Sequence, residues 1–306
     1  MQIHHRALRR RGGTLESSGT GGPLISILTP SFNQIKWLAD NLQSVACQSY
    51  PHIEHIVMDG GSTDGSVELL AQAGPGVRWR SESDEGQADA LNKAFRKSRG
   101  EIIGWINSDD AYFDRRTIDI VVAFFAANPE VDMVYGHAAQ VNADGLILHM
   151  MWAPRFSMSW FKLYDFIFQS TVFMRRRALG DRLVDRSLHF AMDYELWLRL
   201  AARKPPARID LPLAIDRVQP GRKSITQAEV MIAENARLAE EHGLVRPTAW
   251  TRKLESVLGI ASRVMGVRLV GAVDRDLAFS AVPTTRRELL KRQLLTRRRD
   301  MPVEGV

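Results

Sequence analysis

Two adjacent carboxylates, Asp109 and Asp110, follow a short apolar run at residues 102–106. Such a run predicts a buried strand, and α/β proteins bind ligands at the carboxyl ends of their strands. Two like charges side by side are costly to bury unless they share a cation. We therefore expect a divalent cation here, held jointly by the protein and by the phosphates of a ligand. The alternative is an ordinary Asn- and Asp-rich turn that caps a helix.

The elements before this pair alternate between strand and helix. Patterns predict strands at 24–28, 53–58, 77–79 and 101–106, and helices at 35–48, 66–70 and 87–97. Short connections between such elements indicate a parallel sheet covered by helices on both faces. Polar turn residues follow three of the strands, at Thr29, Asp59 and Asn107. They should meet at one edge of the sheet, where a nucleotide would lie.

The second half of the chain is less regular. We expect a helix at 117–127, strands at 131–136 and 170–174, a hairpin at 138–149, a helix starting at Asp193 and short strands within 207–218. After residue 226 the pattern is helical, with a helix at 227–242. Apolar residues then recur at helical spacing from Leu254 to Ala272. This amphipathic helix either packs on its own domain or lies at a membrane interface, because its charged residues make a bilayer span costly.

The positive charge of the chain lies at its two ends. The net charge is +6 overall, +3 over residues 1–22 and +6 over residues 251–306, which leaves −3 for the segment between them. Nucleic-acid binding predicts a basic core, so basic ends on an acidic core fit an anionic membrane surface better. The alternative is solvated tails. The single cysteine, Cys47, excludes an internal disulfide and fits a reducing compartment. With no apolar N-terminal stretch, we expect a cytoplasmic protein, peripheral at the inner face of the membrane.

Five motifs occur in a fixed order and together resemble family 2 glycosyltransferases of the GT-A fold. They are Thr-Pro-Ser-Phe-Asn, Val-Met-Asp-Gly-Gly-Ser-Thr-Asp-Gly-Ser, Ser-Asp-Glu-Gly-Gln-Ala-Asp-Ala-Leu-Asn-Lys-Ala, Ile-Asn-Ser-Asp-Asp and Asp-Tyr-Glu-Leu-Trp-Leu-Arg-Leu. The resemblance covers residues 23–225. It implies a GT-A domain with a mostly parallel twisted sheet at 23–225. The two ends lie outside the resemblance: the Arg-, Gly- and Ser-rich composition predicts a flexible basic arm at 1–22, and the helical pattern predicts a helical basic extension at 226–306.

The resemblance implies inverting transfer of a sugar from a nucleoside diphosphate donor to an acceptor hydroxyl, assisted by Mg²⁺ or Mn²⁺. A metal on the diphosphate stabilises the charge that develops as this group leaves. We expect Asp110 to be the metal ligand and Asp109 to contact the ribose or the waters of the metal. Asn107 stands at the first place of the family's D-x-D pattern, so one direct carboxylate ligand is expected. One such ligand suits Mg²⁺, which keeps several waters.

The acceptor hydroxyl must lose a proton as it attacks, and a carboxylate within hydrogen-bond reach can take it. Asp193 matches the family's base position, and Glu195 is the second choice. The alternative is that Asp193 caps a helix and Glu195 lies in its first turn, which helix physics favours unaided.

Further residues match the family's donor-binding positions. Thr29, Pro30 and Asp59 are expected to wall a uracil or guanine pocket. Gly60 replaces a second Asp that many family members have, so direct reading of the base by a carboxylate is in doubt.

Asp84 and Asp89, which precede Lys93, resemble the family's sugar and nucleotide contacts. All three could instead be polar residues at a helix start. Arg217, Arg222 and Lys223 could close over the diphosphate, or form a solvated loop.

Two other features concern the acceptor and the function class. The aromatic residues Trp152, Trp160, Phe161 and Tyr164 could stack on a glycan or lipid-linked acceptor, or pack in the core.

A sugar nucleotidyltransferase shares the sheet and the metal but usually has a Gly-rich basic loop after the first strand, which this chain lacks. A catalytically silent nucleotide-binding module is the third alternative.

Overall fold

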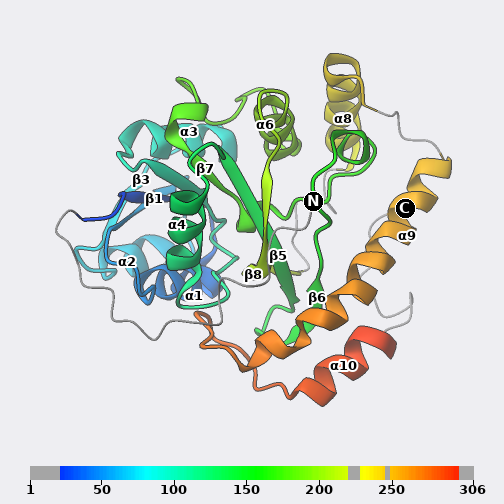
Figure 1. Ribbon diagram of the computed structural model, residues 1–306. Helices are drawn as coiled ribbons and strands as arrows, with labels where there is room; N and C mark the ends of the chain where they lie inside the picture. Colours follow the sequence, from blue (N-terminus) through cyan, green and yellow to red (C-terminus); the bar gives the residue numbers. More distant parts are fainter. Residues whose placement is uncertain (1–20, 220–227, 245–248, 296–306) are drawn as a thin grey trace.

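The computed structural model describes residues 21–219, 228–244 and 249–295 (Figure 1). Most of the expected basic arm, the cations Arg222 and Lys223, and the last eleven residues, 296–306, therefore lie outside the described part. The expected domain boundary at residue 226 also falls outside it, so this division remains a prediction.

Parallel strands form the first half of the sheet, in the order β3-β2-β1-β4. The strands are β1 (Ile25–Ser31), β2 (Ile53–Asp59), β3 (Val77–Ser81) and β4 (Ile102–Trp105). The helices between them are α1 (Ile35–Ala46), α2 (Ser66–Ala71) and α3 (Gln87–Lys97). This arrangement brings the carboxyl ends of β1, β2 and β4 to one edge, as the alternating pattern predicts.

The second half makes the sheet mixed. Its strands are β5 (Met133–Val141), β6 (Ile147–Met151), β7 (Phe173–Arg175) and β8 (Ala207–Arg217). β7 pairs antiparallel with β4 and β5, β6 pairs antiparallel with β5, and β8 pairs parallel with β5. The segments predicted at 131–136 and 138–149 share one long strand, β5. Gly136 lets it continue, since a Cβ there would lie 2.5 Å from Cγ of Leu213.

Helices cover both faces of the sheet, as expected. The second half contributes α4 (Thr117–Ala127), α5 (Met158–Phe161), α6 (Met192–Ala201) and the short helices η1 (Gln169–Thr171) and η2 (Arg176–Ala178). Alternate residues of the strands face opposite ways. Leu28 and Ile103 pack with α3 and α6, whereas Ile27 and Ile102 pack with α1 and α4.

Of the C-terminal helices, the last three pack against β6 at the far edge of the sheet, whereas the first lies beside α6 (Figure 1). They are α8 (Ala228–His242), α9 (Ala249–Gly266), η3 (Val267–Asp274) and α10 (Arg286–Leu295). The amphipathic helix predicted from 254 to 272 is therefore an α-helix that tightens into a 3₁₀ turn after Gly266. Val270 and Leu289 join a core with Ile147 of β6. Among the described residues, the stretch Ser256–Asp274 is apolar and long enough to cross a membrane, by length and composition alone, and 11% of it is buried.

The crossing of α9 over β6 depends on a glycine. A Cβ at Gly266 would lie 1.8 Å from the carbonyl oxygen of Met150, whereas a Cβ at Gly259 would meet nothing within 4 Å. We expect Gly266→Ala to lower the free energy of unfolding by about 1–3 kcal/mol, because the backbone must move apart. The control Gly259→Ala should raise it by about 0.5–1 kcal/mol, the usual gain in a helix interior. Thermal or urea unfolding measures both, and equal effects would contradict the close crossing.

Candidate active site

A cavity of about 930 Å³ opens at the carboxyl ends of β1, β2 and β4. Its wall continues to the first turn of α6, so Asp110 and Asp193 line the same hollow although 83 positions separate them. Among the described residues, five carboxylates line it, those of Asp84, Asp109, Asp110, Asp193 and Asp216. The sheet thus gathers acidic groups from distant parts of the chain at one place.

Arg217, the last residue of β8, fixes the Asp109–Asp110 turn. Its Nε donates to the carbonyl of Asp109 (2.8 Å), its backbone N–H to Oδ1 of Asp110 (3.0 Å) and its Nη2 to Oδ2 of Asp40 (2.6 Å). Its side chain is 3% exposed. The expectation that Arg217 closes over a diphosphate is therefore wrong, because the guanidinium is buried and already holds the turn. Gln219 adds a bond from Nε2 to Oδ2 of Asp109 (2.7 Å).

The charge balance of the cavity bears on a metal. The lining that the structure describes includes one arginine, Arg217, and no lysine. An anionic diphosphate would be repelled by five carboxylates unless a cation came with it. Within the described residues, no three His, Cys, Asp or Glu side chains gather as a closed metal site. Asp110, as a single carboxylate, would suit an open site, in which ligand oxygens and water complete the coordination of Mg²⁺ or Mn²⁺.

Asn107 takes part in an amide network at the floor of the cavity. Its Oδ1 accepts bonds from Nε2 of Gln87 (2.8 Å) and Nε1 of Trp105 (2.9 Å), and its Nδ2 donates to Oε1 of Gln169 (3.0 Å). Both lone pairs of Oδ1 are used, so Asn107 offers no oxygen to a metal. An Asp here would set a carboxylate against Oε1 of Gln169. Sequence analysis gave no role to either glutamine: Gln87 lies within one of the five motifs but was not singled out, and Gln169 lies outside all of them.

Asp193 lies in the first turn of α6 and is partly buried at the cavity wall. Loss of solvation raises the pKa of Asp193 to about 6, although the N–H of Tyr194 donates to its Oδ1 (2.8 Å) and opposes the shift. Burial, and then the charge of Asp193, raises the pKa of Asp165 well above its usual value. Asp165 is therefore harder to ionise than an ordinary aspartate, in part because the charge of Asp193 acts on it. The sequence pattern gave no sign of Asp165.

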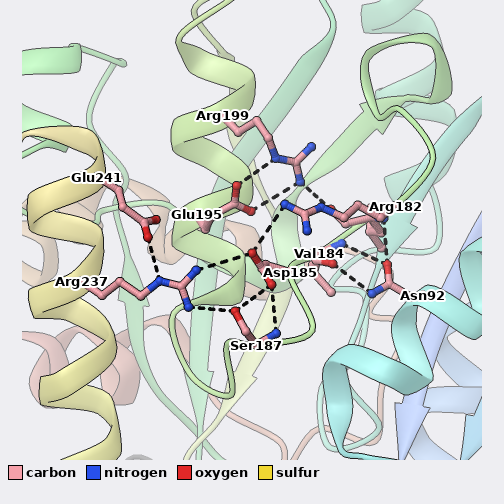
Figure 2. A network of polar contacts seen from close by, with 10 residues as sticks. Asn92, Arg182, Val184, Asp185, Ser187, Glu195, Arg199, Arg237 and Glu241 are labelled. Atoms are coloured by element: carbon pink, nitrogen blue, oxygen red, sulfur yellow. Dashed lines mark hydrogen bonds and ion pairs between the residues drawn. The ribbon is translucent and has the colours of Figure 1, made fainter.

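Glu195, the second choice as base, has another role. It does not line the cavity and is 7% exposed, and its Oε1 accepts a bond from Nε of Arg199 (3.0 Å). Figure 2 shows this pair on the flank of α6, beside the ion pairs that Arg237 of α8 makes with Asp185 and Glu241. The structure thus brings Asp193 to the cavity and keeps Glu195 out of it.

A carboxylate from α8 anchors the loop that leads to Asp193. Glu234 is 8% exposed and accepts three backbone N–H bonds, from His189 (2.7 Å), Phe190 (2.8 Å) and Ala191 (3.0 Å). His189 and Phe190 also line the cavity. Glu234 therefore holds one wall of the site from outside it, a role that its place in an ordinary helical pattern did not reveal.

Two residues expected in the nucleobase pocket lie behind its wall. Pro30 lines the cavity, but Thr29 and Asp59 do not. Thr29 is fully buried, with Oγ1 2.9 Å from Nε2 of His55. Asp59 is 1% exposed and accepts bonds from the backbone N–H groups of Gly61 and Ser62 and from the hydroxyls of Ser62 and Ser81. The expectation of direct contact needs correction here, since Thr29 pairs with His55 of β2 and Asp59 holds the turn after β2.

Asp84 accounts for the glycine at position 60. Asp84 lines the cavity, and its Oδ1 accepts the N–H of Gly86 (2.9 Å). A Cβ at position 60 would lie 2.9 Å from Oδ2 of Asp84. The carboxylate of Asp84 therefore fills the space that a side chain at position 60 would need.

Asp89 and Lys93 also lie outside the cavity lining. They pair with each other (3.0 Å), Lys93 pairs with Glu82 (3.2 Å), and Asp89 pairs with Arg186 (3.2 Å). These ion pairs hold the start of α3 in place. The expected direct contact with a donor therefore finds no support for these two residues.

The chain is similar to a known family and to individual members of it. The model described as Glycosyl transferase family 2 matches residues 26–192. An uncharacterized glycosyltransferase of Mycobacterium tuberculosis is 34% identical over 119 residues, 38% of this chain and 45% of the relative. A glycosyltransferase assigned to teichuronic acid biosynthesis in Bacillus subtilis is 37% identical over 95 residues, 29% of this chain and 37% of the relative. The chain thus spans less than half the length of either relative.

Solved structures share the fold. The crystal structure of S. aureus TarS matches with a TM-score of 0.56 and 20% identity, over 71% of this chain and 40% of that one. A mannosyltransferase from Pyrobaculum calidifontis, solved in complex with GDP-Man and Mn²⁺, matches with a TM-score of 0.54 and 20% identity, over 88% of this chain and 79% of that one. At 20% identity, these similarities show a shared fold, that is, the same arrangement of sheet and helices.

The two acidic residues of the first turn of α6 should affect stability in opposite directions. The pKa of Asp193 is raised in the folded protein, so its charge disfavours folding; the cost grows as pH rises from about 4 to 6 and is complete above 6. We expect Asp193→Asn to raise the free energy of unfolding at pH 7.5 by on the order of 1–3 kcal/mol. At pH 4 the gain should nearly vanish.

Glu195→Gln is the matched control. It removes a partner of Arg199, so we expect a loss of about 0.5–2 kcal/mol at pH 7.5. Urea unfolding at both pH values distinguishes the variants. If Asp193→Asn instead lowered the free energy of unfolding at pH 7.5, the charge of Asp193 would not disfavour folding, and its pKa would not be raised by burial.

Proposed function

The chain belongs to glycosyl transferase family 2, and on that premise we propose that it moves a sugar from a nucleoside diphosphate donor to an acceptor hydroxyl, with inversion at the anomeric carbon. Membership and the shared fold confirm the resemblance noted in the motifs. The single observation that supports the proposal best is the cavity itself, which joins the Asp109–Asp110 turn to a carboxylate of raised pKa.

Asp193 is the proposed base. As the acceptor oxygen attacks the anomeric carbon, its proton passes to the carboxylate of Asp193, while the bond from that carbon to the diphosphate breaks on the opposite face. A base works best when its pKa lies near the working pH. Burial brings the pKa of Asp193 into that range, so the group is ionised near neutral pH yet basic enough to accept a proton.

Asp110 is the proposed metal ligand. A Mg²⁺ or Mn²⁺ ion would stabilise the negative charge of the departing nucleoside diphosphate. Arg217 orients Asp110 through its backbone N–H, and Asp109 is fixed on the adjoining wall, where it would contact the ribose or the waters of the ion. The neighbour solved with GDP-Man and Mn²⁺ supports this choice of donor class and ion.

Asp84 is the proposed donor contact on the β2 side. Its carboxylate reaches the cavity from the turn after β3 and fills the space beside Gly60. A carboxylate here would accept a hydrogen bond from a ribose hydroxyl or from an N–H of the base. Pro30 offers an apolar surface nearby.

The acceptor is proposed to be a glycan or a lipid-linked sugar in the synthesis of cell-surface polysaccharide or glycolipid. The relative assigned to teichuronic acid biosynthesis supports this class. Basic residues at both ends of the sequence support a peripheral place at the cytoplasmic face of an anionic membrane.

Donor turnover tests the function directly. Purified protein with Mn²⁺ and a panel of UDP-, GDP- and dTDP-sugars should release nucleoside diphosphate. Pyrophosphate from UTP and a sugar 1-phosphate would indicate a nucleotidyltransferase instead, and no product a silent module.

Asp110 can be tested by ligand-induced stabilisation. A donor at a hundredfold excess over Kd stabilises the folded state by about 2.7 kcal/mol. We expect Asp110→Ala, and the milder Asp110→Asn, to lose the part of the shift that requires Mn²⁺. The amide of Asp110→Asn still accepts the N–H of Arg217, so the turn should persist. Asp144→Asn, an exposed change in the β5–β6 turn, is the control. A full Mn²⁺-dependent shift in Asp110→Asn would reject Asp110 as ligand.

Asp193 can be tested by rate and pH. We expect Asp193→Asn to bind donor normally and to transfer sugar about 10²–10⁴-fold more slowly, the usual contribution of a positioned base. In the unaltered protein the rate should fall as pH drops through about 6, because Asp193 is then protonated. Glu195→Gln should retain transfer. Near-normal turnover by Asp193→Asn would assign the proton transfer to another group.

A further inference from the structure

A second hollow lies next to the cavity. It measures about 300 Å³, at the lower end of ligand pockets, and lies between α9 and the segment that leads into η1. Its lining is mainly apolar and includes Trp152, Trp160, Tyr164 and Leu258. Phe168 lines both this hollow and the larger cavity. One side chain therefore separates an apolar pocket from the cavity that contains Asp193.

The apolar surface of the pocket continues outward along α9. Val257, Ile260 and Val264 are exposed to 59%, 42% and 53%. With about 100° of rotation per residue, these three share one side of the helix. Leu258 and Ala261, which line the pocket, follow directly beside them. Figure 1 shows α9 along the outer edge of the sheet next to β6. Pocket and exposed stripe thus form one apolar surface.

Charged and aromatic residues around this surface suit a lipid rather than a soluble sugar. Arg155 is exposed at the pocket, and Lys253 precedes Val257 by one helical turn on the same side. Trp160 is 51% exposed, and Trp152 and Tyr164 are partly buried at the same pocket. Aromatic residues with one polar end are enriched at the interface between membrane and water, and basic side chains attract anionic headgroups. Phe161, by contrast, is fully buried in the core.

We propose that the pocket holds the hydrocarbon chain of a lipid-linked acceptor, with α9 lying in the surface of an anionic membrane. The polar head of that lipid reaches Asp193 by passing Phe168, and Arg155 is placed to meet its phosphate. This inference rests on the proposed function and names its acceptor class. It also explains the exposed apolar residues of α9, because the membrane that contains the acceptor lipid covers them.

Fluorescence quenching tests the proposal without requiring turnover. The probe is a vesicle of phosphatidylcholine and phosphatidylglycerol whose acyl chains carry bromine, which quenches tryptophan on contact. We expect the full-length protein to be quenched by these vesicles and less so by phosphatidylcholine alone. Trp152→Phe and Trp160→Phe should each remove part of the quenching, whereas Trp79→Phe, on β3 and away from the pocket, should not.

A charge in the pocket provides the decisive variant. Leu258→Asp should weaken vesicle binding about tenfold, the factor expected for the loss of one buried leucine. Circular dichroism shows whether it folds, and Val257→Ser, on the exposed stripe, gives a milder test should it not. Absence of quenching in the unaltered protein, or equal quenching in the Trp152→Phe and Trp160→Phe variants, would overturn the proposal. So would a stable dimer that Val257→Ser dissolves, since a second copy would then cover the stripe.

The same samples separate this inference from the proposed function. Donor-induced stabilisation with Mn²⁺ is measured on the unaltered protein beside the quenching. Stabilisation without quenching rejects the lipid pocket alone. Quenching without stabilisation or nucleotide release rejects sugar transfer, and with it the acceptor role of the pocket, and leaves a surface that binds lipid.

Discussion

The crowding of carboxylates at one edge of the sheet is the constraint on which the site depends. Five acidic side chains reach one cavity, and like charges so close are costly. The protein offsets this cost in different ways at the two ends of the cavity. At the Asp109–Asp110 turn a buried guanidinium, Arg217, supplies hydrogen bonds and opposite charge. At the first turn of α6, burial raises the pKa of Asp193 to about 6, and burial together with the charge of Asp193 raises the pKa of Asp165.

These two arrangements would suit the two roles proposed for the site. A carboxylate fixed by hydrogen bonds suits a cation that accompanies a diphosphate, and a carboxylate held against its solvation suits the acceptance of a proton. The difference comes from surroundings alone, since both groups are aspartates. Glu195 lies two residues after Asp193, on another side of the helix, where it pairs with Arg199, so the first turn of α6 presents one acid to the cavity and not two.

Local patterns predicted the elements and the carboxyl edge of the sheet. The helices at 87–97 and 117–127 were predicted with the bounds observed, because their apolar faces and flanking turn residues are local signals. Contacts between distant segments were not predictable in this way. Asn107 meets Gln169, Gly60 meets Asp84, and Glu234 meets the loop before α6. Thr29 and Asp59 were placed wrongly because strand-end position does not show which way a side chain hydrogen-bonds.

The three bonds that Glu234 accepts have a consequence for how this protein can be divided. The family model ends at residue 192, one position before Asp193, yet the loop beneath that residue is anchored by a helix 35 or more positions further on. A catalytic domain that ended just before α8 would keep Asp193 but leave three amides of the preceding loop without their acceptor. Chimeric enzymes built by exchanging C-terminal segments between relatives must therefore carry an equivalent acid with the exchanged part. Helix α8 is therefore part of the structure that supports the cavity wall.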